Sequence, residues 1–161
     1  MNAIMLSASL CVGVALTTLA QVTFETDLLP TSAGELGMTF IGHGTLMFSF
    51  KGKVIHVDPW SDLADYTHLP KADLILITHE HRDHLDGVAI SMLRVPSTTV
   101  LLPPRCAGNV DGGLVMTNGQ TRTVAGVKIE AVPAYNIVQM RSPGSPFHPR
   151  GVGNGYILTF G

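Results

Sequence analysis

The chain has 161 residues, a formal net charge of −2 and ten basic residues that form no cluster. Its length suits one domain with a real core, and the charge pattern excludes a basic footprint for nucleic acid. The two cysteines, Cys11 and Cys106, supply neither a disulfide framework nor a zinc-type cysteine pair.

Residues 1–20 are small and apolar and contain no charged side chain. Such a segment is typical of a secretory signal peptide, with Leu19-Ala20 as the cleavage point. The first few residues contain no lysine or arginine, so an uncleaved membrane anchor and a mis-assigned start or buried N-terminal segment stay open. We therefore expect periplasmic or secreted export if the segment is cleaved, and otherwise a cytoplasmic chain. Stable membrane contact is expected only for the uncleaved form.

Residues 21–35 have a mixed pattern and are predicted to be a linker before a domain over residues 36–161. Short apolar runs at 36–41, 45–50 and 53–57 alternate with turn-like Gly-containing triplets, which predicts a β-meander. His43 lies in the first turn. Asp58 follows the third run and precedes a proline, so it is either a turn residue or a carboxylate that orients a ligand histidine.

The densest cluster of chemically active side chains comes next. Residues 72–78 form an apolar, β-branched run that predicts a buried strand, and residues 85–94 have apolar positions at helical spacing. The turn between strand and helix holds four candidate ligands, His79, His81, Asp83 and His84. Open α/β folds place their sites at this carboxyl end of a strand.

Imidazole nitrogen and carboxylate oxygen are both ligands for zinc and similar ions. His79 and His81 are two positions apart, so in extended backbone they point the same way and suit one ion. Asp83 and His84 come as the chain turns into the helix and suit a second ion. Two ions roughly 3.5–4 Å apart would share an activated water and stabilise charge on the substrate. The alternative is a polar surface loop with a chance run of histidines.

Beyond this loop, the patterns predict a strand at 98–102, one helical turn within 105–109, a hairpin from 120–124 and 127–132, and a strand at 156–160. Asn136 leaves the second hairpin strand. His148 lies between Phe147 and Pro149 and reads either as a loop residue or as a ligand or substrate contact.

The His79-x-His81-x-Asp83-His84 pattern resembles the HxHxDH signature of the metallo-β-lactamase superfamily. The pieces at 40–44, 57–60, 72–79 and 132–136 are similar to its small metal-dependent hydrolases, which include ascorbate-6-phosphate lactonase-like proteins. The resemblance covers residue 36 to the last residue. It implies an α/β (α+β) fold: the N-terminal portion of an αββα sandwich, with a mixed sheet and flanking helices.

The resemblance also implies a hydrolase that uses a metal-activated water on an ester, lactone or phosphoester bond of a small-molecule substrate. Zinc, with two ions, is favoured, and manganese or iron would fit a mixed His and Asp site. Asp83 would also orient the water or protonate the leaving group. His43 stands in a Gly-His that related proteins carry near the metals.

Two departures from the family pattern matter. Asn136 stands where many members have a third metal-binding histidine, and an amide oxygen is a poor ligand beside imidazole. The expected Gly-Asp motif and final histidine do not follow residues 156–160. We therefore expect a C-terminally truncated domain. A non-catalytic metal-binding half-domain, an inactive fragment and a homo-oligomer in which a second copy fills the missing layers stay open as alternatives.

Overall fold

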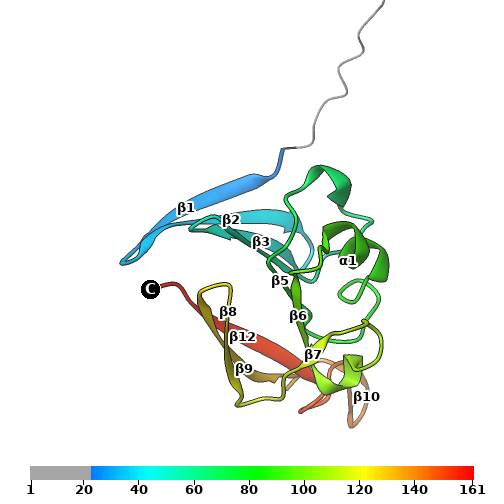
Figure 1. Cartoon of the computed structure of the whole chain (residues 1–161). Coiled ribbons are helices and arrows are strands. Elements are labelled where there is room, and N and C mark those ends of the chain that lie inside the picture. The colour runs from blue at the N-terminus through cyan, green and yellow to red at the C-terminus, as the bar shows by residue number, and fades with distance from the viewer. Residues whose placement is uncertain (1–22) are drawn as a thin grey trace, which may run out of the picture.

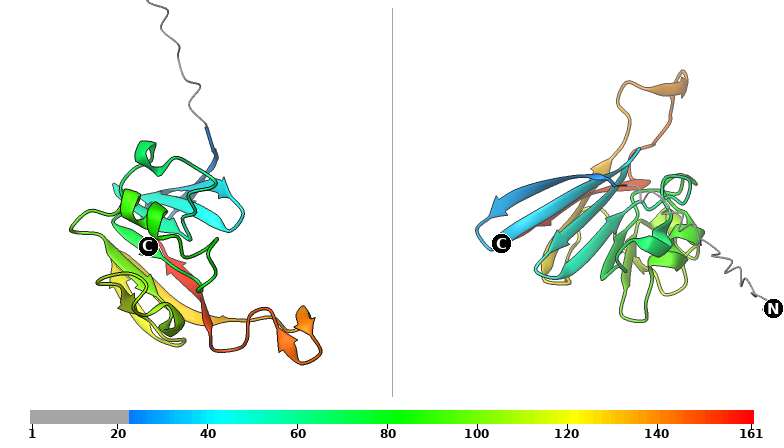
Figure 2. Two further views of the ribbon diagram at one scale, coloured as in Figure 1. Left: turned by 90° about the vertical axis from the view of Figure 1, so that its right-hand side faces the viewer. Right: turned by 90° about the horizontal axis from the view of Figure 1, so that it is seen from above.

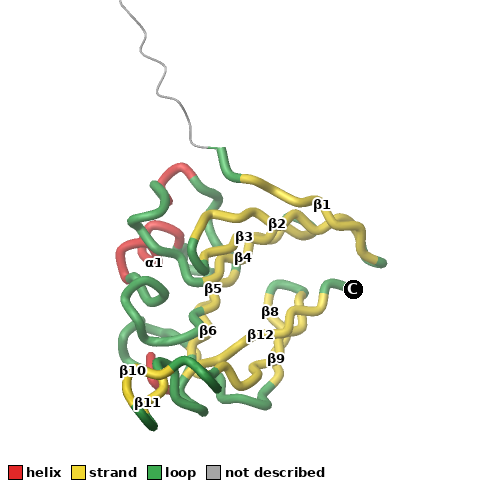
Figure 3. The backbone as a smooth tube through the Cα atoms, turned by 180° about the vertical axis from the view of Figure 1, so that it is seen from behind, coloured by secondary structure: helices red, strands yellow, loops and turns green. Residues whose placement is uncertain are grey.

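The structure is a computed structural model and describes residues 23–161. The predicted signal segment at 1–20 lies outside this range. The chain forms a seven-stranded sheet in the order β1 to β7, a three-stranded sheet in the order β12-β9-β8, and a separate two-stranded hairpin, β10-β11. Figures 1 and 3 show the two larger sheets facing each other, with helix α1 on the outer side of the larger one.

The meander predicted at the start of the domain is confirmed. Its strands are β2 (Gly34–Gly42), β3 (Thr45–Phe50) and β4 (Lys53–Val57), and both pairings are antiparallel. Lys51 and Gly52, between β3 and β4, both have positive φ values, +49° and +73°. Two such residues in succession make the tight hairpin turn whose twist matches the flanking strands.

The predicted linker at 21–35 is wrong. Strand β1 (Glu25–Thr31) occupies most of it and pairs antiparallel with β2, from Glu25 opposite Phe40 to Thr31 opposite Gly34. β1 is an edge strand with six of its seven side chains exposed, so it shows no apolar alternation. Pro30 is tolerated there because an edge strand needs hydrogen bonds on one side only.

The parallel part of the larger sheet contains β5 (Leu74–Leu76), β6 (Thr99–Leu102) and β7 (Leu114–Val115). Helix α1 (Gly87–Leu93) links β5 to β6, and the Asp86 carboxylate caps it by accepting from the backbone N–H of Val88 and Ala89. The predicted strand and helix are both present, each shorter than its pattern. The short 3-10 turns are η1 (Tyr66–His68) and η2 (Pro104–Cys106).

The smaller sheet contains β8 (Thr121–Val124), β9 (Val127–Ala134) and β12 (Gly153–Thr159), with the predicted β8-β9 hairpin. Strands β10 (Met140–Ser142) and β11 (Ser145–Pro146) were not predicted, because three and two residues are too few to show a pattern. Both views in Figure 2 show this orange hairpin projecting away from the two sheets.

Two apolar cores hold the fold together, and β5 separates them. Ile75 and Ile77 pack toward α1, whereas Leu74 and Leu76 pack between the two sheets. This alternation follows from the two-residue period of a strand, and it fixes where the chain emerges after β5. The predicted mixed-sheet α+β class is confirmed. Among residues 23–161, no helix has the length and apolarity that a membrane crossing requires.

Candidate metal centre

The loop after β5 carries the four residues singled out in the sequence. It turns tightly, because the backbone N–H groups of His84 and Leu85 both donate to the carbonyl of His81, at 2.9 and 2.8 Å. The turn reverses the chain before α1 begins. His79 and His81 therefore face one way, while Asp83 and His84 lie against the turn between β2 and β3.

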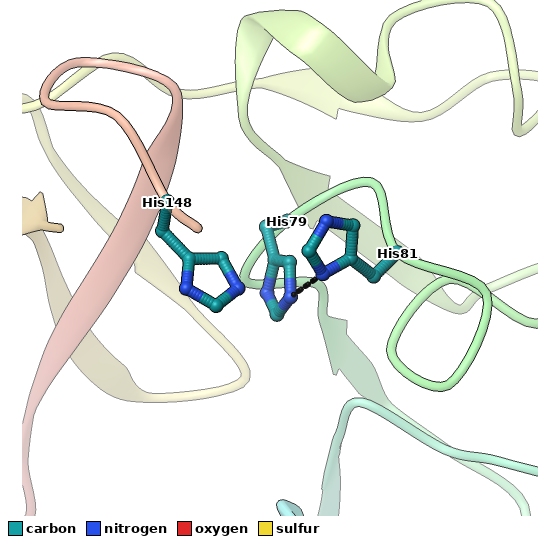
Figure 4. Close-up of side chains that lie close together, drawn as sticks. All are labelled: His79, His81 and His148. Atoms are coloured by element: carbon teal, nitrogen blue, oxygen red, sulfur yellow. Dashed lines mark hydrogen bonds between the residues drawn. The ribbon is translucent and has the colours of Figure 1, made fainter. Parts of the chain in front are cut away.

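The first group of potential ligands is His79, His81 and His148, whose donor atoms all lie within 4.8 Å of one another. His79 Nε2 and His81 Nδ1 are 3.1 Å apart, and the three rings converge from two segments of the chain (Figure 4). His148 follows β11, so it reaches the metal loop from the side of the smaller sheet.

Asn136 does not join this group but holds His148. Its side-chain Oδ1 accepts from the backbone N–H of His148 at 2.8 Å and lies 2.7 Å from His148 Nδ1. The backbone N–H of Asn136 donates back to the carbonyl of His148 at 2.9 Å. Because an amide oxygen can only accept, Nδ1 carries the proton and Nε2 keeps its lone pair for a metal.

The second group is His43, Asp83 and His84. Asp83 Oδ2 lies 2.9 Å from His43 Nε2 and 3.6 Å from His84 Nε2. Gly44 makes room for this arrangement, because a Cβ there would lie 3.0 Å from Cε1 of the His84 ring.

Asp58 lies beneath the second group and is buried. Its Oδ1 accepts from the backbone N–H of Thr78 at 2.8 Å, and its Oδ2 accepts from the Thr78 hydroxyl at 2.5 Å and from His84 Nδ1 at 2.8 Å. The carboxylate is thus already hydrogen-bonded through both oxygens. This is the geometry of an orienting partner that leaves His84 Nε2 free to bind a metal.

The two groups adjoin each other. Asp58, His79 and His84 form a third set of donor atoms within 4.8 Å, and His79 and His84 belong to the first and second groups respectively. The ring centroids of His79 and His84 are 4.0 Å apart. The donor types and their spacing fit two neighbouring divalent ions.

The surroundings of the site lower the pKa of two candidate histidine ligands, His79 and His148. Burial lowers the pKa of His79 to about 4, and the neighbouring imidazoles of His84 and His81 lower it further, so this imidazole is neutral at neutral pH. Burial also lowers the pKa of His148, and His81, His84 and Arg141 add to the effect. Metal binding needs such unprotonated nitrogens.

The pKa values of His84 and Asp83 shift in opposite directions. For His84, burial lowers the pKa, but the hydrogen bond and charge of Asp58 outweigh it and raise the value overall. For Asp83, burial raises the pKa, but its own backbone N–H and the His43 hydrogen bond bring it below its usual range. Asp83 is therefore ionised at neutral pH, which is the form that binds a metal.

Strand β12 contributes residues that the sequence did not indicate. The backbone N–H of Asn154 donates to the Thr78 carbonyl at 2.8 Å, and the Tyr156 hydroxyl donates to the Ile77 carbonyl at 2.8 Å. These bonds satisfy the last carbonyls of the chain leaving β5. Tyr156 and Ile77 are 79 positions apart, so no local signal could have linked them.

A pocket of about 440 Å³ opens over the first group. One wall is the metal loop, with Thr78, His79, Glu80, His81 and His84. The opposite wall is formed by the segment between β9 and β12, including Tyr135, Phe147 and His148. Ligand pockets for small molecules are commonly of this size.

A sequence profile of the β-lactamase superfamily domain matches residues 37–161. The chain belongs to the metallo-β-lactamase superfamily. Among its curated relatives, UPF0173 metal-dependent hydrolases of Thermodesulfovibrio yellowstonii and Hyperthermus butylicus are 29% and 27% identical over 147 and 128 residues. Each alignment covers 74% of this chain, and 52% and 55% of the respective relative.

Solved structures agree with this membership. A protein described as a metal-dependent hydrolase of Parabacteroides distasonis is 47% identical, with a TM-score of 0.79, over 86% of this chain and 62% of that one. A metallo hydrolase of Ignicoccus hospitalis is 26% identical with a TM-score of 0.57, over 76% of this chain and 55% of that one. The chain spans about half the length of the curated relatives it matches.

Proposed function

We propose that this chain is the metal-binding part of a hydrolase that directs a metal-activated water onto an ester, lactone or phosphoester bond. His79, His81 and His148 hold one ion, and His43, Asp83 and His84 hold a second. The observation that carries the proposal is the convergence of two adjoining donor groups at the pocket, built from three separate segments of the chain.

When bound, the metal supplies a Lewis acid and a water of lowered pKa. The chain supplies the orientation. Asp58 sets the ring of His84, and Asn136 sets the ring of His148. Asp83 orients the attacking water or protonates the leaving group, and the ionised state of its carboxylate suits the first role.

Zinc is the proposed metal, because imidazole nitrogens make up most of both groups. The carboxylate in the second group is also compatible with manganese or iron. The proposed substrate is a small molecule, in keeping with the pocket volume of about 440 Å³. Export of the chain is a separate proposal that rests on the composition of residues 1–20 alone.

The second candidate is a non-catalytic metal-binding half-domain, and the coverage of the relatives favours it. The chain matches little more than half of each relative's length, so the remainder of each relative has no counterpart in the alignment. Bound metal would then mainly hold the loop in place, as structural ions do.

Metal content by mass spectrometry, combined with an ester, lactone and phosphodiester hydrolysis screen, tests the proposal. We expect two ions per chain in the wild type, and loss of both metal and turnover in a His79→Ala, His81→Ala variant. His68→Ala, which changes an exposed histidine outside both groups, is the control. Two ions without turnover would favour the half-domain, and absence of bound metal would overturn both candidates.

A further inference from the structure

Two aromatic rings of the pocket wall opposite the metal loop each have an arginine beside them, although neither arginine is itself among the residues that line the pocket. Tyr135 and Phe147 line it, and each is about two-fifths exposed. An arginine lies over each ring: the guanidinium carbon of Arg150 is 5.4 Å from the Tyr135 centroid, and that of Arg141 is 5.1 Å from the Phe147 centroid. All four residues belong to the segment that carries the β10-β11 hairpin (Figure 2).

This segment is positively charged within an acidic chain. Residues 131–161 contain Arg141 and Arg150 but no lysine, aspartate or glutamate, whereas the whole chain has a net charge of −2. Among residues 23–161, neither guanidinium has a carboxylate within 4.0 Å. Two acidic residues line the opposite side of the pocket: Glu80 is paired with Arg105 at 3.5 Å, and Asp58 with His84 at 2.8 Å.

The placement of each guanidinium over a ring leaves the arginines available for a ligand. A cation–π contact at an exposed site contributes only about 0.5–1 kcal/mol and uses none of the hydrogen-bond donors of the guanidinium. The N–H groups around its edge remain free to donate to a carboxylate or phosphate in a two-point contact. The ring contact also limits the motion of the side chain, so less entropy is lost when an anion binds.

We propose that this wall binds the anionic, partly apolar portion of the substrate. Arg141 and Arg150 hold a carboxylate or phosphate group, and the rings of Tyr135 and Phe147 pack against the adjoining apolar or aromatic part. The scissile bond then lies across the pocket, at His79, His81 and His148. The assignment of this ligand as a substrate rests on the proposed function, whereas its binding does not.

Binding is tested on the metal-loaded chain with two dyes that share an aromatic skeleton, anilinonaphthalene sulfonate and neutral phenylnaphthylamine. In R141E/R150E we expect the Kd of the sulfonate to rise roughly tenfold or more, because charge-assisted hydrogen bonds are lost and like charges meet. The Kd of the neutral dye should stay within about twofold, since the apolar surface remains.

The matched control is R122E/K128E, which makes the same change in net charge on the exposed faces of β8 and β9. It should leave both Kd values unchanged. R141Q/R150Q should give an intermediate loss, with a circular dichroism spectrum like that of the wild type. Equal weakening of both dyes, or an equal effect of the control, would overturn the proposal. Competition by nitrobenzoate and by nitrophenyl phosphate then identifies the preferred anion.

Hydrolysis separates this inference from the proposed function. With nitrophenyl acetate and the anionic nitrophenyl succinate, R141E/R150E should lower the ratio of anionic to neutral kcat/KM roughly tenfold. An unchanged ratio in an active variant contradicts the anion site. If the wild type turns over no ester, lactone or phosphodiester of the screen but R141E/R150E weakens only the sulfonate dye, the anion site stands and the proposed hydrolase function fails.

Discussion

His43 and Asp58 have unusual backbone conformations at the site. Their φ values are +50° and +44°, in the left-handed region that side chains other than glycine rarely adopt. Such conformations cost of the order of 1 kcal/mol or more and persist only where the surroundings impose them. At Asp58, the backbone N–H donates to the Leu76 carbonyl at 2.9 Å and the carbonyl accepts from the Thr45 hydroxyl at 2.6 Å.

Asp58→Asn tests the orienting role at the residue scale. The amide cannot match the acceptor strength of the carboxylate toward both Thr78 and His84, so His84 loses its fixed ring orientation. We expect the second ion to bind about 10–100-fold more weakly while the first is little affected. Calorimetric metal titration measures both steps. Asp62→Asn, a change in an exposed loop residue, is the control, and equal affinities in the two variants would contradict the role.

His56 lies outside the metal site, and we expect it to contribute to the pH dependence of the free energy of unfolding. It is fully buried, its Nε2 is 3.1 Å from the Pro70 carbonyl, and its Nδ1 has no partner among the described residues. Burial lowers its pKa to about 4, against a hydrogen bond to Pro70 that raises it. The folded chain therefore keeps this ring neutral while the unfolded chain binds a proton near pH 6.5.

The sign of the resulting pH dependence follows from proton binding. Between pH 6.5 and about 4 the unfolded state binds more protons, so the free energy of unfolding falls as the pH falls. His56→Gln keeps a donor for the Pro70 carbonyl but does not titrate, and should remove up to about 3 kcal/mol of this dependence. Urea unfolding of metal-free protein at several pH values measures it. His68→Gln, at an exposed histidine, should retain the wild-type dependence.

At the scale of elements, β12 supports the carboxyl end of β5. Tyr156→Phe removes the hydroxyl that donates to the Ile77 carbonyl, which leaves a buried acceptor unpaired. We expect a loss of about 1–2 kcal/mol in the free energy of unfolding and weaker metal binding. Tyr135→Phe is the control for stability, because Tyr135 is exposed at the pocket wall. Equal stability of the two variants would show that β12 does not support β5 in this way.

Glycine at the start of β12 permits close approach to the metal loop. A Cβ at Gly153 would lie 3.2 Å from the Thr78 carbonyl oxygen and 3.4 Å from His79 Cβ, so Gly153→Ala should displace His79 and weaken metal binding by roughly tenfold. Gly87→Ala, at the first residue of α1 where a Cβ meets nothing within 4 Å, should instead raise stability by about 0.5 kcal/mol. Metal titration and urea unfolding of both variants check this contrast.

For the whole molecule, the first ion would join two parts of the fold. His79 and His81 follow the larger sheet, whereas His148 belongs to the segment that precedes β12 of the smaller sheet (Figure 1). Zinc at about 100 times its Kd should therefore raise the free energy of unfolding by about 2.7 kcal/mol. His148→Ala should remove the part of the gain that the first ion supplies, and an undiminished gain in the variant would place this ion elsewhere. Thermal unfolding with and without zinc measures the difference.

The local sequence pattern predicted the strands and the helix that have strong apolar periodicity. It missed the strands whose formation depends on pairing with another part of the chain. The runs behind β2, β3, β4 and β5 are apolar because each strand packs against a core, so their burial is visible in composition. β1 carries no such signal, because an edge strand can be exposed on both faces and still be held by its hydrogen bonds to β2. The short strands β10 and β11 also carry no apolar signal, and they are held by their pairing with each other.

The sequence by itself determined the ligand types in the metal loop and the strand and helix that frame it, since both depend on neighbours along the chain. It also marked Asp58, His43 and His148 as candidates without choosing among their roles. Only the tertiary structure decided that Asn136 holds His148, that Asp58 holds His84, and that β12 supports the loop. These contacts join residues 12 to 79 positions apart, and such distances are set by how the sheets pack rather than by any local pattern.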